Sequence, residues 1–187
     1  QPEGLKNVFV TNGYQTPEAV AGMKGLIDAA NVDLKAFTEE FYRKHCRARL
    51  QGVLDAIEAL YEAGIHLEIT TLVVPGQNDS EDELRGIAEF IADIDPDIPW
   101  HISRFHPDYK VDDIQPTPIS TLRSALECAR EAGLNYAFVG NVVTEEGQHT
   151  YCPECGEVVI RRSGFRATVE LDGSSCPQCG AELPILR

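Results

Sequence analysis

The sequence has 187 residues, of which 43% are hydrophobic and 25% charged, proportions that are ordinary for a globular protein with its own core. No apolar run approaches the roughly 18 residues of a membrane span, and the first residues do not resemble a signal peptide. The formal net charge of −14 disfavours binding to nucleic-acid phosphates, and residues 151–187, with four arginines against five acids, are the one segment where such binding stays open.

Five short apolar segments in the first 140 residues predict β-strands, and helical patterns separate them. The segments are residues 7–10, 31–34, 67–74, 100–103 and 136–139. This alternation predicts a parallel sheet with right-handed crossovers. Five strands are too few for a closed eight-stranded barrel of about 250 residues, so we expect an open sheet or a partial barrel. Because Gln1 stands just before the first predicted strand and is not a methionine, we expect the later part of a longer protein, which favours the partial barrel.

Local signals mark where several of the helices begin and end. Thr16 and Thr117 each precede a proline, as a capping residue does before a first helical turn. Ser80 is followed three residues later by a glutamate, which predicts a capping box. Gly64 and Gly133 follow alanine-containing helical stretches, where a left-handed helix end is expected.

Polar or glycine-bearing residues follow every predicted strand. Function in parallel α/β sheets collects at the carboxyl ends of the strands, so these residues predict a site at one mouth of a barrel. The candidates are Asn12, Asp33, Lys35 and His106. Each has a structural alternative: a turn at Asn12, a simple ion pair between Asp33 and Lys35, and loop hydrogen bonding by His106. Together, an amide, a carboxylate, an ammonium and an imidazole suit a small zwitterionic ligand.

The end of the chain carries two near-identical C-P-x-C-G segments. They predict two knuckles that hold one metal ion through four cysteines, Cys152, Cys155, Cys176 and Cys179. Four thiolates leave no open coordination position, so we expect a structural zinc site on a β-hairpin of residues 157–162 and 166–171. Disulfides or redox-active dithiols, and iron in a rubredoxin-like site, are the alternatives. We place a domain boundary between residues 1–148 and this ribbon, residues 149–187.

Two further cysteines, Cys46 and Cys128, stand alone on predicted helices, and we expect them to be small, half-buried side chains. His45 adjoins Cys46 in sequence only, because neighbours on an α-helix point in different directions. The chain can bury its own core and shows no secretory signal, and four of its six cysteines form metal-type pairs. A reducing, cytoplasmic setting is therefore expected.

Several segments, in this order, resemble the second half of a radical S-adenosylmethionine (SAM) enzyme. They are Thr11-Asn12-Gly13, Asp33-Leu34-Lys35, Val73-Val74-Pro75-Gly76 with Asn78-Asp79, and Trp100-His101-Ile102-Ser103-Arg104-Phe105-His106-Pro107. They are similar to the branch related to pyruvate formate-lyase activating enzymes and, with the terminal C-P-x-C-G pair, more closely to the radical enzyme of the AmmeMemoRadiSam system. The resemblance covers nearly the whole chain and implies a partial (β/α) TIM-type barrel of the radical SAM kind with a small C-terminal zinc ribbon.

This resemblance implies that Asp33, Lys35 and His106 contact the amino-acid part of SAM, with Asn12 nearby. One departure is Val10, where that branch commonly has aspartate. A larger departure is the absence of a motif. Such enzymes hold their [4Fe–4S] cluster with a C-x-x-x-C-x-x-C motif, and this motif does not occur in this sequence. We therefore expect part of an enzyme that cleaves SAM reductively to a 5′-deoxyadenosyl radical. Its partners would be SAM and a substrate, a protein among the candidates, and this chain by itself is expected to be inactive.

Two other functions are compatible with the residues. Lys35 can act as a Schiff-base lysine in an aldolase-like barrel, with Asp33 beside it. The other function is that of a non-catalytic adaptor, whose ribbon binds a partner protein through the clustered Arg161, Arg162 and Arg166.

Overall fold

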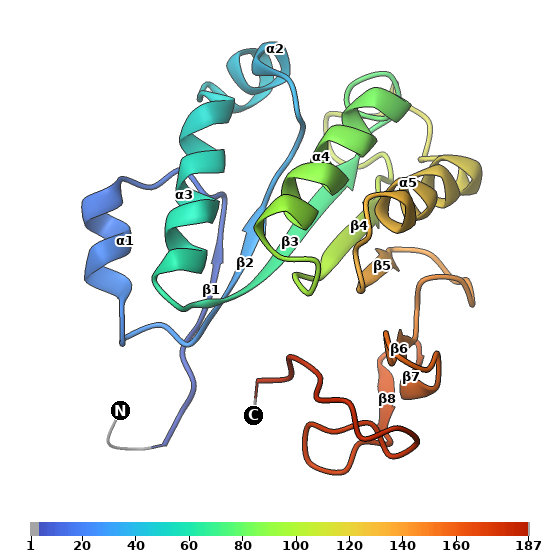
Figure 1. The fold of residues 1–187 in the computed structure, drawn as a ribbon. Coiled ribbons are helices and arrows are strands. Elements are labelled where there is room, and N and C mark those ends of the chain that lie inside the picture. Colours follow the sequence, from blue (N-terminus) through green and yellow to red (C-terminus); the bar gives the residue numbers. More distant parts are fainter. Residues whose placement is uncertain (1–3, 187) are drawn as a thin grey trace.

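The structure, a computed structural model, describes residues 4–186. Its larger part is a five-stranded parallel sheet in the order β1-β2-β3-β4-β5 (Figure 1). The strands are β1 Val8–Thr11, β2 Ala29–Asp33, β3 His66–Val73, β4 Trp100–Arg104 and β5 Ala137–Gly140. Strands that are consecutive in the chain are neighbours in the sheet, so the predicted parallel α/β fold is confirmed.

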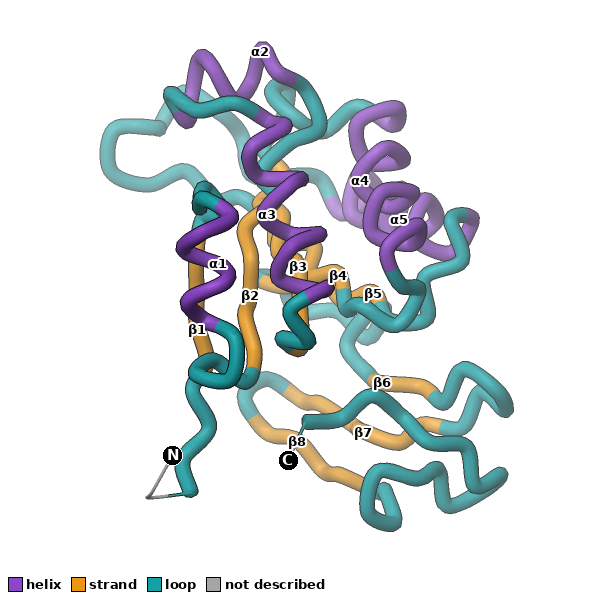
Figure 2. Tube along the Cα trace, turned by 60° about the vertical axis from the view of Figure 1, so that its left-hand side comes forward, coloured by secondary structure: helices purple, strands orange, loops and turns teal. Residues whose placement is uncertain are grey.

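Helices join the strands and cover one face of the sheet (Figure 1, Figure 2). They are α1 Pro17–Met23, α2 Glu39–Phe41, α3 Leu50–Glu62, α4 Glu81–Ile94 and α5 Ile119–Glu131, with a π-helical turn, η1 Tyr42–Cys46, directly after α2. Right-handed crossovers between consecutive parallel strands place α1, α3, α4 and α5 on the same side, whereas α2 lies beyond the carboxyl ends of the strands (Figure 1). The other side is the open inner face of a partial barrel. In residues 4–186, every helix is too short or too polar to cross a membrane.

The main hydrophobic core lies between the sheet and its helices. Alternate strand residues such as Val32 and Ile69 are fully buried there, against Ile57 and other apolar residues of α3. Trp100 of β4 is also fully buried, and its Nε1 donates a hydrogen bond to Thr71 Oγ1 at 3.0 Å. The period-2 burial of the strands therefore leaves their other residues on the inner face.

Most of the predicted helix ends are confirmed. Thr16 Oγ1 and Ser80 Oγ each accept a hydrogen bond from the backbone N–H three residues later. Gly64 and Gly133 have φ values of +77° and +87°, which is the left-handed conformation expected where a helix ends. The capping box at Ser80 is only half formed, because the Glu83 carboxylate accepts hydrogen bonds from the loop before α2 instead.

The prediction that Thr117 caps a helix is wrong, because Pro118 takes the N-cap position of α5. Thr117 is fully buried, and its Oγ1 accepts a hydrogen bond from the Phe105 N–H (2.9 Å) and donates one to the Val73 carbonyl (2.6 Å). The hydroxyl therefore ties the end of β3 to the segment after β4. This contact joins residues far apart in sequence, which a local capping signal does not reveal.

A second, antiparallel sheet, β6-β7-β8, lies beyond the amino ends of the parallel strands (Figure 1). Its strands are β6 Thr150–Tyr151, β7 Val158–Ser163 and β8 Arg166–Val169, and β7 and β8 form the predicted hairpin. Tyr136, next to β5, packs into the hydrophobic cluster of this ribbon with Val159, Leu183 and two of the cysteines. The ribbon therefore closes the end of the sheet opposite to its carboxyl edge.

Candidate functional site

The carboxyl end of β2 carries the predicted ion pair. Lys35 Nζ lies 2.8 Å from Asp33 Oδ2, and both side chains are partly exposed on the inner face. The backbone beside this pair is held from two sides, because the Lys35 N–H donates to Tyr42 Oη (3.1 Å) and its carbonyl accepts from Asn78 Nδ2 (2.5 Å). The pair therefore stands on a fixed segment rather than on a free loop.

Asn12 follows β1 and lies near this pair. Its Oδ1 accepts a hydrogen bond from the Tyr14 N–H at 3.1 Å, which is the turn geometry of an asparagine before glycine. Gly13 has a φ of +70°, and a Cβ there would lie 2.8 Å from a methyl carbon of Val32. Asn12 and Lys35 line the same surface hollow of about 320 Å³. The structure thus brings three of the four predicted residues to one corner of the carboxyl edge.

His106 lies elsewhere on the same edge. It follows β4, which β3 separates from β2. Its Nε2 lies 2.8 Å from the Asn141 carbonyl oxygen, and Asn141 Nδ2 donates to the Arg104 carbonyl at 3.2 Å. Within residues 4–186, the side chain of His106 therefore contacts the end of β5 and not Asp33 or Lys35.

Below the edge, the inner face carries a polar layer that the sequence analysis did not single out. Thr70 Oγ1 donates to Asn31 Oδ1 at 2.8 Å, and His101 Nε2 lies 2.8 Å from Glu68 Oε2. The hydrogen bond from His101 holds the pKa of Glu68 below its ordinary value, and burial opposes it. Barrel interiors are usually filled by branched apolar residues, whereas this face carries a carboxylate, an imidazole, an amide and a hydroxyl group. Polar residues at alternate positions of β3 were the sequence signal that could have revealed this layer.

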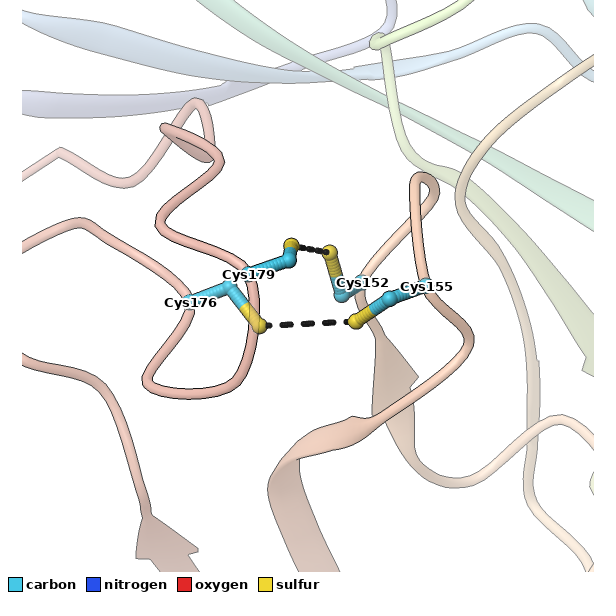
Figure 3. Close-up of side chains that lie close together, drawn as sticks. All are labelled: Cys152, Cys155, Cys176 and Cys179. Atoms are coloured by element: carbon cyan, nitrogen blue, oxygen red, sulfur yellow. Dashed lines mark hydrogen bonds between the residues drawn. The ribbon is translucent and has the colours of Figure 1, made fainter.

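At the other end of the sheet, the four ribbon cysteines converge (Figure 3). Cys152 Sγ lies 3.6 Å from Cys179 Sγ, Cys155 Sγ lies 3.7 Å from Cys176 Sγ, and all four sulfurs lie within 4.8 Å of one another. Sulfurs about 2.3 Å from one central ion in a tetrahedron are roughly 3.8 Å apart, whereas a disulfide needs about 2.05 Å. The spacing therefore fits a tetrathiolate metal site, and it suits zinc and iron equally.

The two knuckles repeat the same backbone geometry. Cys152 and Cys176 each donate their N–H to the carbonyl five residues later, at 2.8 Å in both cases. Gly156 and Gly180 each donate back to the carbonyl of the first cysteine at 2.9 Å, with φ values of +75° and +78°. Such turns aim backbone N–H groups at the sulfurs, so the duplicated sequence folds into a duplicated ligand cradle.

The environment also separates the acidities of these thiols. Burial raises the pKa of Cys176, but hydrogen bonds from the backbone N–H groups of Cys179 and Gln178 and from neighbouring thiols outweigh it and lower the value to about 7. For Cys155 a backbone N–H lowers the pKa, but burial and the shared thiol hydrogen bonds raise it to about 12. The hydrogen bonds shared among the thiols therefore act in opposite directions on the pKa values of Cys176 and Cys155.

A [4Fe–4S] cluster does not fit the cysteines of residues 4–186. Cys128 is buried in the main core and Cys46 is half-buried near Lys35. Among these residues, the ribbon set is the one group of three or more histidine, cysteine or acidic side chains close enough to hold an ion. The spacing of its four sulfurs suits one mononuclear ion, so the described residues offer no set of cysteines for such a cluster.

Residues 1–91 match the family model described as the Radical SAM superfamily. An uncharacterized protein of Methanocaldococcus jannaschii is 41% identical over 98% of this chain, which covers 55% of that protein. A GTP 3′,8-cyclase of Corynebacterium glutamicum is 35% identical over 41% of this chain and 21% of the cyclase. The chain thus spans about half the length, or less, of the curated relatives that it matches.

Two solved structures share the fold. A domain of a pyruvate-formate lyase-activating enzyme from Bacteroides vulgatus superposes with a TM-score of 0.64 and 20% identity, over 75% of this chain and 84% of that one. A radical SAM methyltransferase from Sphaerobacter thermophilus gives a TM-score of 0.58 and 13% identity, over 71% of this chain and 39% of that one. The family match thus concerns residues 1–91, and the two solved structures show that the fold of the chain is shared with radical SAM enzymes.

Proposed function

We propose that this chain supplies part of the SAM-binding sheet of a radical SAM enzyme. The observation that carries the proposal is the ion pair of Asp33 and Lys35, on the inner face at the carboxyl end of β2 and next to Asn12. SAM has an ammonium and a carboxylate at its amino-acid end. Asp33 would accept hydrogen bonds from the ammonium, Lys35 would pair with the carboxylate, and Asn12 would orient them.

His106 would contribute from β4. Its ring reaches the Asn141 carbonyl, so one ring nitrogen is engaged and the other stays available to a ligand above the sheet. His106 would therefore contact the amino-acid part of SAM from two strands away. The polar layer of Glu68 and His101 beneath would line the floor of the same interior.

In the parent enzyme, SAM would supply the 5′-deoxyadenosyl radical that removes hydrogen from a substrate. The [4Fe–4S] cluster needed for this would be held by a C-x-x-x-C-x-x-C loop outside the 187 residues. Two sequence features support a place in the branch related to pyruvate formate-lyase activating enzymes and, within it, a likeness to the radical enzyme of the AmmeMemoRadiSam system. They are the W-H-I-S-R-F-H-P run and the two C-P-x-C-G knuckles. The gene upstream of the Gln1 codon tests this directly: a reading frame without that cysteine motif contradicts the assignment.

SAM binding tests the site residues. Equilibrium dialysis with labelled SAM, carried out on the protein together with its upstream segment, should give weaker binding by about tenfold for Asp33→Asn and for Lys35→Gln. Lys24→Gln removes a lysine charge just after α1 and is the matched control. Equal affinities for the three variants and the unaltered protein would rule out this edge as the SAM site.

For the ribbon, residues 149–187, we propose a structural zinc site in a protein of the cytoplasm, attached to a partial barrel of residues 1–148. An adaptor role gains less support, because two of the three clustered arginines are engaged within the chain. Arg161 Nε pairs with Glu170 at 3.2 Å, and Arg162 lies against the sheet. A Schiff-base role for Lys35 is the remaining alternative, and trapping of a carbonyl compound on Lys35 by borohydride would favour it.

A further inference from the structure

The hollow shared by Asn12 and Lys35 extends beyond the proposed SAM contacts. Its volume is about 320 Å³, and its far wall is the turn η1 together with the residues that follow it. Tyr14, Phe41 and the buried Tyr42 are among the residues that line it. The hollow is therefore a concave surface at the rim of the partial barrel, lined by both aromatic and polar side chains.

Basic side chains line this hollow, and one of them, Lys35, is already paired with Asp33. Lys35, His45 and Arg47 line it, and no carboxylate does, although the chain carries a formal net charge of −14. Residues 43–49 read RKHCRAR and contain four of the 16 lysines and arginines. In this segment Arg43 and Arg49 pair with Glu39, at 3.1 and 3.8 Å, whereas in residues 4–186 the guanidinium of Arg47 has no acidic partner.

The backbone of η1 gives this segment its shape. In an α-helix, successive residues point about 100° apart, so three in a row face different directions. Here the chain widens into a π-helical turn and Arg47 takes a left-handed conformation, with φ at +53°, where its N–H donates to the Tyr42 carbonyl. His45, Cys46 and Arg47 are all among the residues that line the hollow. Such turns are frequent at functional sites.

We propose that this hollow binds an oxyanion of the substrate, a carboxylate or a phosphate, through Arg47 and His45. The aromatic rings would hold the carbon skeleton that bears the oxyanion. This inference rests on the proposed function, because it names the substrate class of an enzyme whose cofactor would sit beside Lys35. The proposal predicts that the substrate is acidic. Its oxyanion would bind at the rim of the partial barrel first, and its reacting carbon would then enter the interior.

The test is a titration of the metal-loaded 187-residue chain with inorganic phosphate and, separately, with succinate, at constant ionic strength. Backbone amide shifts in ¹H–¹⁵N NMR should move around residues 42–48. Arg47→Gln should raise the dissociation constant about tenfold, as expected for loss of one charge-assisted hydrogen bond, and His45→Gln should raise it several-fold. The probe with the smaller dissociation constant identifies the oxyanion as phosphate or carboxylate.

Arg166→Gln is the matched control, because Arg166 lies exposed on β8 of the ribbon and its loss changes the net charge equally. It should leave both titrations unchanged. The proposal is overturned if neither probe shifts residues 42–48, or if Arg47→Gln and Arg166→Gln have equal effects. Circular dichroism of each variant separates lost binding from lost folding. No SAM is present in this titration, so its outcome and that of the SAM-binding test are independent.

Discussion

The guanidinium of Arg162 in the ribbon lies 5.0 Å from the centre of the Phe138 ring on β5. His101 stacks on the same ring with the ring centres 5.4 Å apart, and its Nε2 lies 2.8 Å from Glu68 Oε2. Burial lowers the pKa of Arg162, and the charge of Glu68 partly offsets this. A stack of arginine, phenylalanine and histidine therefore connects the ribbon to the inner face of the sheet, so we interpret the ribbon as the floor of the partial barrel.

Arg162→Ala should lower the free energy of unfolding by about 1–3 kcal/mol. Besides the ring contact, Arg162 Nη1 donates to the Gln148 carbonyl (3.0 Å) and to Thr150 Oγ1 (2.8 Å), and truncation leaves these acceptors unpaired. Urea denaturation followed by circular dichroism measures the change. Arg166→Ala, at an exposed position of the same hairpin, should stay within about 0.5 kcal/mol. A similar loss for both variants would contradict the interpretation of Arg162 as the link to the sheet.

Glu68 should make stability depend on pH in the acid range. Its pKa in the folded chain lies below the ordinary value of 4.5, so its ionised form stabilises the fold above that value, and this stabilisation is lost as pH falls through the folded pKa. The difference in unfolding free energy between the unaltered chain and Glu68→Gln should therefore shrink from about pH 6 to about pH 3.5. Glu58→Gln, exposed on α3, is the control for removal of one negative charge. A difference that stays constant over this range would disprove the effect.

The ribbon should contain one zinc ion per chain. Cys152→Ser and Cys176→Ser should abolish metal binding and unfold residues 149–187, because a structural zinc site contributes about 10 kcal/mol or more to a small metal-dependent fold. Elemental analysis of the purified protein measures both the identity and the amount of metal. Cys128→Ala, in the main core, should retain the ion. Iron in place of zinc, or two disulfides without metal, would be the contrary result.

Gly13→Ala should destabilise the fold by about 2–4 kcal/mol. The substitution places a side chain at a φ of +70° and brings its Cβ to 2.8 Å from Val32 Cγ1 and 3.0 Å from Val53 Cγ1. Gly64 has a similar left-handed backbone conformation, and nothing lies within 4 Å of a Cβ added there. Gly64→Ala should therefore lower the free energy of unfolding by only about 1–2 kcal/mol. Thermal unfolding of the two variants isolates the steric part, and equal costs would show that the turn before Tyr14 can relax.

The sequence by itself determined the parts of this protein that local patterns encode. The five strands and their parallel order followed from apolar segments separated by helical ones, because burial alternates with the period of each element. The ribbon followed from its two C-P-x-C-G segments, because each knuckle is closed by hydrogen bonds within six residues. The pairing of Asp33 and Lys35 was also local, since residues two apart in extended backbone share a face, here at the end of β2 and just beyond it.

Only the tertiary structure decided which distant residues meet. Asn12 joins Lys35 at one hollow, whereas His106 turns to Asn141, because strand register and loop packing place them there. The bond between Glu68 and His101 depends on the register of β3 against β4, which no periodicity reveals. The segment that carries His45 and Arg47 to the hollow combines a π-helical turn with a left-handed residue, and the local sequence pattern predicted neither. Long-range register and local departures from ideal geometry are set by the packing of the whole chain, so they appear only once it is folded.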